Sequence, residues 1–62
     1  MAVYYRLYFL GDDGHIVGHS AWDSEDDTEA MQCAEAVQEG RAMELWCGNR
    51  VVRRYPKPLD RR

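Results

Sequence analysis

Two cysteines and two histidines are the side chains best suited to metal binding or nucleophilic chemistry: Cys33, Cys47, His15 and His19. A structural zinc site needs four ligands, and these four could supply a Cys₂His₂ set. Their spacing does not match a zinc finger. His15 and His19 are expected on one strand, where four residues span roughly 13 Å at about 3.3 Å per residue. Side chains that far apart cannot share an ion, so we expect no metal site and expect both cysteines to pack as small apolar residues.

Catalysis is not expected either. Nothing in the sequence positions a Cys–His pair, and a chain of 62 residues offers little cleft for a substrate. The glycine-flanked segment 11–14 is acidic, whereas a phosphate-binding loop needs free N–H groups and cations. Its two aspartates also lack the ligand spacing of an EF-hand. We therefore expect no enzyme, no catalytic residue and no cofactor.

The remaining candidates are aromatic residues and arginines on one face of the expected sheet. They are Tyr4, Arg6, Tyr8, Trp46, Val51, Arg53 and Tyr55. Residues of these types are enriched in protein–protein interfaces, and a small chain gains stability by burying apolar surface against a partner. The leading hypothesis is an interaction domain that forms a homodimer, through this face or an edge strand, or binds another protein. Two alternatives remain: base stacking with single-stranded nucleic acid, and scattered side chains with no partner.

The charge distribution bears on these alternatives. The net charge is −3, but residues 1–39 hold one Arg against nine acids, while residues 40–62 hold seven Lys or Arg against two acids. Such asymmetry suggests an interaction surface. The net negative charge counts against nucleic acid. One basic cluster counts for it: Arg50, Arg53, Arg54, Lys57, Arg61 and Arg62.

The cellular location follows from similar patterns. No basic segment followed by an apolar run precedes the first strand pattern, and no apolar run approaches membrane-spanning length. Two cysteines are also too few for a disulfide framework. We therefore expect a cytoplasmic protein that does not enter a membrane.

One helix is expected at about residues 26–39. Small side chains recur there at the spacing of one helical face: Ala30, Cys33, Ala34 and Val37. Asp26 is a good N-cap, and Glu29 occupies the capping-box position three residues later. Gly40 suits the left-handed conformation that often follows a helix. We expect the small side chains to let this helix lie close against a sheet.

A hairpin is expected on each side of the helix. Residues 3–10 and 15–22 form the first, around the turn at 11–14, and its register is left open. A three-residue loop pairs Phe9 with Val17, whereas a four-residue loop shifts the register by one and swaps the faces. Residues 42–47 and 50–55 form the second hairpin around the Gly48-Asn49 turn.

The two-residue turn predicts the pairs of the second hairpin. Trp46 is expected opposite Val51, with the further pairs Leu45–Val52, Glu44–Arg53 and Ala42–Tyr55. The core would then include Leu7, Phe9, Leu45 and Val52, and Tyr55 would face away from the helix. The predicted fold is α+β: ββαββ, a four-stranded antiparallel sheet with strand order 2-1-3-4 and one helix on one face. Residues 1–55 form the domain, and residues 56–62 form a basic, flexible tail.

Four stretches also resemble a family of short bacterial proteins of ββαββ type. They are Tyr5-Arg6-Leu7-Tyr8-Phe9-Leu10, Asp13-Gly14-His15-Ile16, Asp26-Asp27 with Ala30, and residues 44–54, which begin with the Glu-Leu-Trp-x-Gly-x-Arg pattern. The resemblance covers nearly the whole chain except the tail, and the last pattern is its most specific part. Cys47 occupies a position that tends to be polar in that pattern. The resemblance implies a free-standing bacterial domain, and it implies no activity, cofactor or partner.

Overall fold

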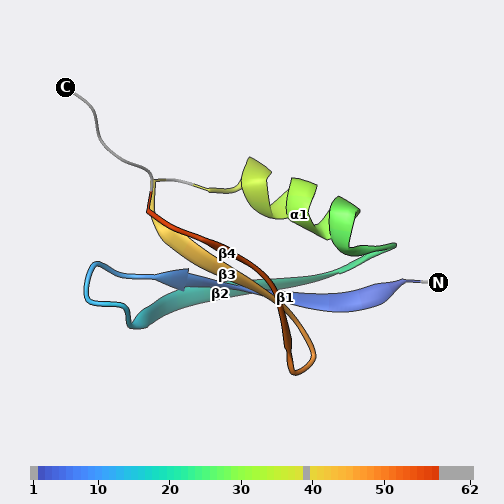
Figure 1. The fold of residues 1–62 in the computed structure, drawn as a ribbon, viewed down its shortest axis with the longest axis horizontal. Helices are drawn as coiled ribbons and strands as arrows, with labels where there is room; N and C mark the ends of the chain where they lie inside the picture. The colour runs from blue at the N-terminus through green and yellow to red at the C-terminus, as the bar shows by residue number, and fades with distance from the viewer. Residues whose placement is uncertain (1, 39, 58–62) are drawn as a thin grey trace.

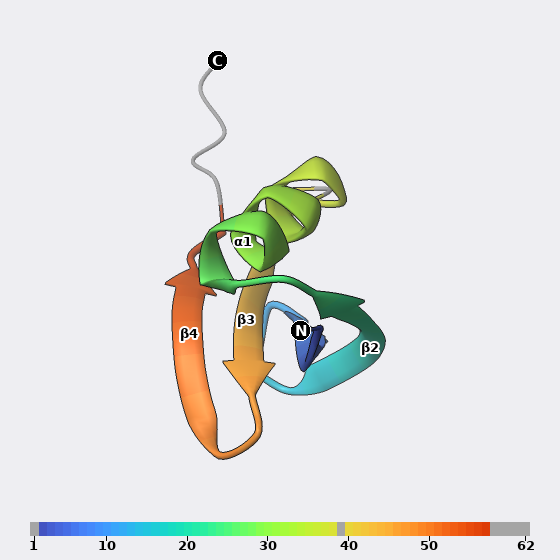
Figure 2. The same ribbon diagram turned by 90° about the vertical axis from the view of Figure 1, so that its right-hand side faces the viewer.

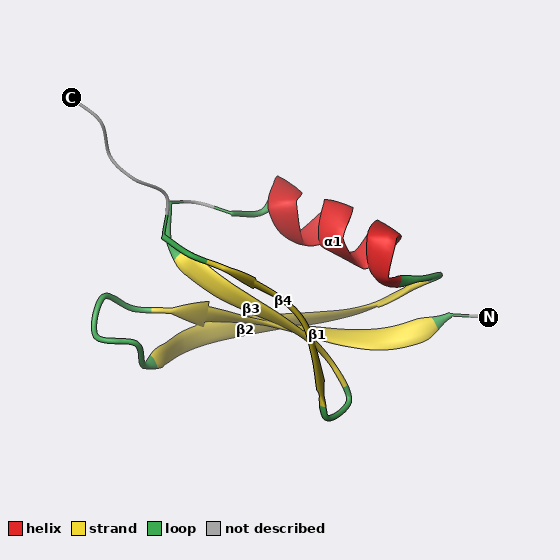
Figure 3. Cartoon of the chain, viewed as in Figure 1, coloured by secondary structure: helices red, strands yellow, loops and turns green. Residues whose placement is uncertain are grey.

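The chain folds into one antiparallel sheet with a helix on one side. The computed structural model describes residues 2–38 and 40–57. The elements are β1 (Val3–Leu10), β2 (Ile16–Ser24), α1 (Asp27–Ala36), β3 (Ala42–Cys47) and β4 (Arg50–Tyr55). The sheet order is β2-β1-β3-β4, and α1 lies on one side of it (Figures 1 and 3). The predicted ββαββ fold and strand order are confirmed, while most of the expected tail, residues 58–62, lies outside the described residues.

The core lies between α1 and the central strands. β1 contributes Tyr5 and Leu7, and β3 contributes Met43 and Leu45, all at most 1% exposed. These residues alternate along their strands because successive side chains point to opposite faces of a sheet. Ala30 and Ala34 of α1 are fully buried against them, and Figure 2 shows α1 lying across β3. The small helical side chains thus permit close packing on the larger side chains of the sheet.

The start of α1 follows the prediction. Asp26 is the N-cap, and its carboxylate accepts a hydrogen bond from the backbone N–H of Glu29 at 2.9 Å. The Glu29 carboxylate accepts in turn from the N–H of Glu25 at 2.9 Å, one residue before the cap. The first bond satisfies an N–H group that a helix start leaves without a partner, and the second holds the residue before the cap against the first turn.

The end and the orientation of α1 differ from the prediction. The helix ends at Ala36 with Val37 as its C-cap, so Gly40 has a positive φ of 77° but does not end the helix. Cys33 is exposed and Val37 is 43% exposed, so the expectation that both line the buried face is wrong. Met31 takes part in the packing instead. The helix is rotated about its axis relative to the prediction, because Asp27 also points toward the sheet, where it accepts a hydrogen bond from Tyr5.

The register of the second hairpin was predicted correctly only near its turn. Cys47 pairs with Arg50 and Trp46 pairs with Val51 around the Gly48-Asn49 turn, where Gly48 has a φ of 61°. Beyond these pairs a β-bulge shifts the ladder by one residue: Leu45 pairs with Arg53, Glu44 with Arg54 and Met43 with Tyr55. A bulge sets two residues against one and turns the following side chains to the other face. The predicted Leu45–Val52, Glu44–Arg53 and Ala42–Tyr55 pairs are therefore wrong.

The first hairpin starts in the register of the three-residue loop, with the Gly11 N–H donating to His15 O at 2.8 Å and Leu10 opposite Ile16, and then shifts by one residue. Phe9 pairs with Gly18 and Tyr8 with His19, while an irregularity between Phe9 and Leu10 brings Leu10 opposite Ile16. Gly14 has a φ of 86°, a conformation that glycine adopts without steric cost. This register places His19 beside Tyr8 on the face of the sheet that α1 leaves uncovered.

Candidate interaction surface

The face of the sheet opposite α1 is not covered by any described element (Figure 1). Its centre is Arg6 on β1, whose neighbours across the ladders are Ala21 of β2 and Trp46 of β3. The face also carries residues from all four strands. We call the whole set the open face: Tyr4, Arg6, Tyr8, His19, Ala21, Asp23, Glu44, Trp46, Val51 and Arg54.

Arg6 lies among aromatic side chains on the open face. Its guanidinium carbon is 5.7 Å from the centre of the Tyr4 ring, a distance at which the ring attracts a cation. The phenol groups of Tyr8 and Tyr4 raise the pKa of Arg6 further above its ordinary value. Together with His19, these side chains line an open hollow of about 300 Å³. Arg6 is therefore a permanent cation held at the wall of an aromatic hollow.

The neighbouring part of the open face is tied together by polar contacts. The Trp46 indole donates a hydrogen bond to Glu44 Oε1 at 3.1 Å. The other oxygen of Glu44 accepts a hydrogen bond from Arg54 Nε at 3.4 Å. Val51 lies opposite Trp46 and is partly buried. This half of the face thus has its aromatic ring and its carboxylate held in fixed positions.

Two of the seven residues predicted for the interaction surface lie elsewhere. Tyr55 is only 7% exposed and belongs to the core, where its hydroxyl donates to Met31 O at 3.4 Å or to Glu35 Oε2 at 3.3 Å. Burial, with the nearby Glu35 charge, raises the pKa of Tyr55. Arg53 lies 5.4 Å from the centre of the Tyr55 ring and so covers it on the helix side. Their placement on the open face was wrong because of the bulge in β4.

The other five predicted residues share the open face as expected: Tyr4, Arg6, Tyr8, Trp46 and Val51. Five other residues of the open face were not among the seven predicted: His19, Ala21, Asp23, Glu44 and Arg54. His19 and Asp23 were missed because the register of the first hairpin was undecided. Arg54 was missed because nothing in the sequence indicates the bulge. Glu44 was expected on this face, but paired with Arg53 instead of Arg54. The open face of the structure is more polar than the predicted surface.

The helix side carries a second polar cluster with a structural role. The Tyr5 hydroxyl donates to Asp27 Oδ1 at 2.7 Å, and Arg50 reaches the same carboxylate at 3.0 and 3.2 Å. The hydrogen bond to Asp27 raises the pKa of Tyr5 to about 12. The Arg50 guanidinium and the Tyr5 hydroxyl hold the pKa of Asp27 below its ordinary value. Because every group in this cluster has a partner, it joins β1, α1 and β4 and offers no ligand site.

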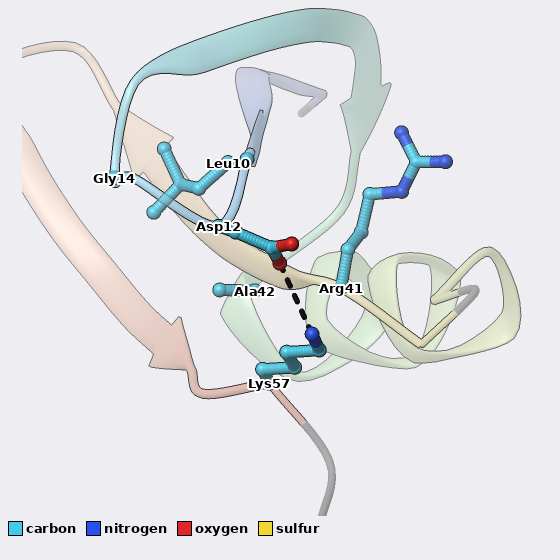
Figure 4. Close-up of a pocket in the computed structure, with 7 residues that line it drawn as sticks. Leu10, Asp12, Gly14, Arg41, Ala42 and Lys57 are labelled. Carbon is cyan, nitrogen blue, oxygen red and sulfur yellow. Dashed lines mark hydrogen bonds and ion pairs between the residues drawn. The ribbon is translucent and has the colours of Figure 1, made fainter.

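A further hollow of about 400 Å³ lies at the β1–β2 turn (Figure 4). Its two cations are already engaged. Lys57 pairs with Asp12 at 3.0 Å, and Arg41 lies 5.9 Å from the centre of the Phe9 ring. An anion would have to displace Asp12, so the geometry does not indicate an anion site.

Within residues 2–38 and 40–57, no cluster of His, Cys, Asp and Glu side chains could hold a metal ion. No helix in the same residues has the length and apolar character needed to cross a membrane. Both cysteines are free, with Cys33 exposed and Cys47 partly buried.

Comparisons with protein-family models, with curated proteins and with solved structures gave no match to this chain. The resemblance to short bacterial proteins therefore stays a prediction from sequence motifs. The open face has to be interpreted from its own geometry.

Proposed function

We propose that this chain is a small cytoplasmic interaction domain that associates with a second copy of itself through the open face. The observation that carries this proposal is that α1 covers one side of the sheet only. The aromatic and charged side chains of the open face lie on the other side, which no described element covers. A chain this small buries a limited core, so covering a second face adds stability. In the cytoplasm its two free cysteines would stay reduced.

The size and charge of the open face suit a second copy. A standard interface buries about 800 Å² per partner, which is about a sixth of the 4648 Å² surface of the chain. Among the described residues the face has two cations, Arg6 and Arg54, and two acids, Asp23 and Glu44. Such a balance favours a partner that is itself balanced in charge, because complementary charges steer association and exclude wrong partners.

Single-stranded nucleic acid is the second candidate. The hollow formed by Tyr4, Arg6, Tyr8 and His19 favours it, because aromatic rings beside an arginine can stack bases. The structure weakens this candidate, since Arg53 and Tyr55 lie on the helix side and Arg54 is paired with Glu44. Nucleic-acid binding would appear as a gel shift with short single strands that weakens steeply with salt and is lost in Arg6→Glu.

Sedimentation velocity across a micromolar concentration series tests the proposal. Ala21 is exposed on the open face next to Arg6, and Ala36 is exposed at the end of α1. Ala21→Lys places a bulky cation at the centre of the interface and should abolish the dimer. Ala36→Lys is the matched control, because it makes the same chemical change on the helix side and should leave the dimer intact.

Two results would contradict the proposal. One is a parent chain that stays monomeric throughout the concentration series. The other is a dimer that Ala21→Lys and Ala36→Lys affect equally, which would place the interface away from the open face. Circular dichroism of both variants establishes that they fold like the parent.

A further inference from the structure

Two opposite charges on the open face have no ionic partner among the described residues. Arg6 contacts the ring of Tyr4 but no carboxylate, and Asp23 is exposed without a salt bridge or a side-chain hydrogen bond. Glu44, the other acid of the face, is already bonded to Trp46 and Arg54. Asp23 is therefore the carboxylate of this face that is available to a partner.

The ladder fixes where these two charges lie. Arg6 is opposite Ala21 and Tyr4 is opposite Asp23 in the β1–β2 pairing. Arg6 and Asp23 are thus diagonal neighbours on adjacent strands, about 7–8 Å apart. A two-fold axis that passes between them would bring Arg6 of each copy over Asp23 of the other. The same surface patch then serves both copies, as in most protein dimers.

We propose that Arg6 and Asp23 form reciprocal salt bridges between two copies packed face to face, and that these contacts set the orientation of the dimer. This inference rests on the proposed function. Its physical basis is the cost of burying a charge without a partner. Any partner that covers the hollow must supply an anionic group to Arg6, and a second copy carries a carboxylate at the matching position.

The surroundings of Arg6 favour a specific salt bridge with Asp23 over a non-specific electrostatic attraction between the two copies. Tyr4 and Tyr8 hold the guanidinium on the open face beside the hollow, so part of the entropic cost of fixing a long side chain is already met. Arginine also presents a planar group that can donate two parallel hydrogen bonds to one carboxylate. Asp23, with a short side chain, loses little conformational freedom when it is bound.

A charge-swap experiment with two variant chains tests the pairing. Arg6→Glu alone places two acids opposite each other twice per homodimer, and Asp23→Lys alone places two cations there. We expect each to weaken its homodimer by on the order of 30-fold or more. An equimolar mixture should restore dimers that contain one chain of each kind, since one contact becomes Glu–Lys and the other stays Arg–Asp. Native mass spectrometry separates these heterodimers by mass.

The control replaces an exposed aspartate away from the open face. Asp13 lies in the β1–β2 turn beside His15, so Asp13→Lys makes the same charge change elsewhere. Mixed with Arg6→Glu, it should form fewer heterodimers than Asp23→Lys does, because one of the two contacts stays Glu–Asp. One chain that carries both Arg6→Glu and Asp23→Lys should form a homodimer by itself, and this outcome also shows that the altered side chains are compatible with folding.

The outcomes distinguish this pairing from the proposed function. A parent dimer that neither single variant weakens overturns the pairing and leaves self-association intact. Restoration by Asp13→Lys as effective as that by Asp23→Lys also overturns it, because net charge would then account for the effect. A parent that never dimerises overturns both.

Discussion

Replacing Tyr55 with alanine should destabilise this protein severely, whereas the same replacement at Tyr4 should have a small effect. The two positions carry the same residue type, and strand alternation alone would place both on the open face. In the structure Tyr55 is 7% exposed within the core, and Tyr4 is 54% exposed. The comparison therefore tests the bulge in β4, which turns Tyr55 toward α1.

The magnitude follows from burial. A buried tyrosine removes at least about 150 Å² from water, which at about 25 cal/mol per Å² corresponds to about 4 kcal/mol. Truncation of a buried aromatic residue to alanine costs about 3–5 kcal/mol, in agreement with this value. A domain of this length is stable by roughly 3–9 kcal/mol, so Tyr55→Ala should remove about half of its stability or more. For Tyr4→Ala we expect about 1 kcal/mol or less, because much of the ring stays in water.

Urea unfolding monitored by circular dichroism measures both changes, at a protein concentration where the parent is monomeric. Tyr55→Phe serves as a control, because it keeps the ring and removes only the hydroxyl, which donates a long hydrogen bond to Met31 O or Glu35 Oε2 of α1. We expect it to cost about 1 kcal/mol. Equal losses for Tyr55→Ala and Tyr4→Ala would refute the bulged register and restore the simple alternation.

Three further predictions concern other contacts. The pKa of Asp27 is lowered in the folded chain, so its contribution to stability is present above the unfolded pKa near 4 and is lost as the pH falls through the folded pKa. Urea midpoints from pH 7 to 2 should therefore decline less in Asp27→Asn, and an unchanged slope would contradict this. Ala34→Leu should destabilise the fold by about 1–3 kcal/mol through overpacking, and a neutral melting curve would show that α1 has space beneath it. A double-mutant cycle should give a coupling of about 0.2–1 kcal/mol for Glu44 with Arg54 and none for Glu44 with Arg53; the reverse order would restore the unbulged ladder.

Much of this fold could be predicted because local patterns agree with one another. Alternation in β1 placed Leu7 in the core, and the two-residue turn placed Trp46 opposite Val51. The cap at Asp26 located the start of the helix. Each of these features depends on residues that are neighbours in the sequence, so the sequence pattern was sufficient to predict them.

The errors arise where distant contacts decide the local structure. A bulge costs little free energy locally. The stabilisation that comes from burying Tyr55 and pairing Glu44 with Arg54 cannot be read from the alternation of residues along a strand. The phase of α1 likewise depends on Asp27, which lies 22 residues from Tyr5 in the chain. Amphipathic spacing favoured Cys33 as a buried residue, but tertiary contacts rotated the helix. Such contacts decided which predicted residues reached the open face.

The strand order has a consequence for folding during synthesis. β1 is the first strand along the chain, but it lies in the interior of the sheet, between β2 and β3. Once the ribosome has released β2, one edge of β1 has no neighbour until β3 has also emerged. At about 5–20 residues per second, synthesis of the chain from the end of β2 at Ser24 to the end of β3 at Cys47 takes on the order of 1–5 seconds. Throughout it, a strand rich in aromatic and branched residues presents an unpaired edge that other nascent chains could extend. Arg6, as the charge within this strand, would then act as a gatekeeper against aggregation before it takes part in any assembly.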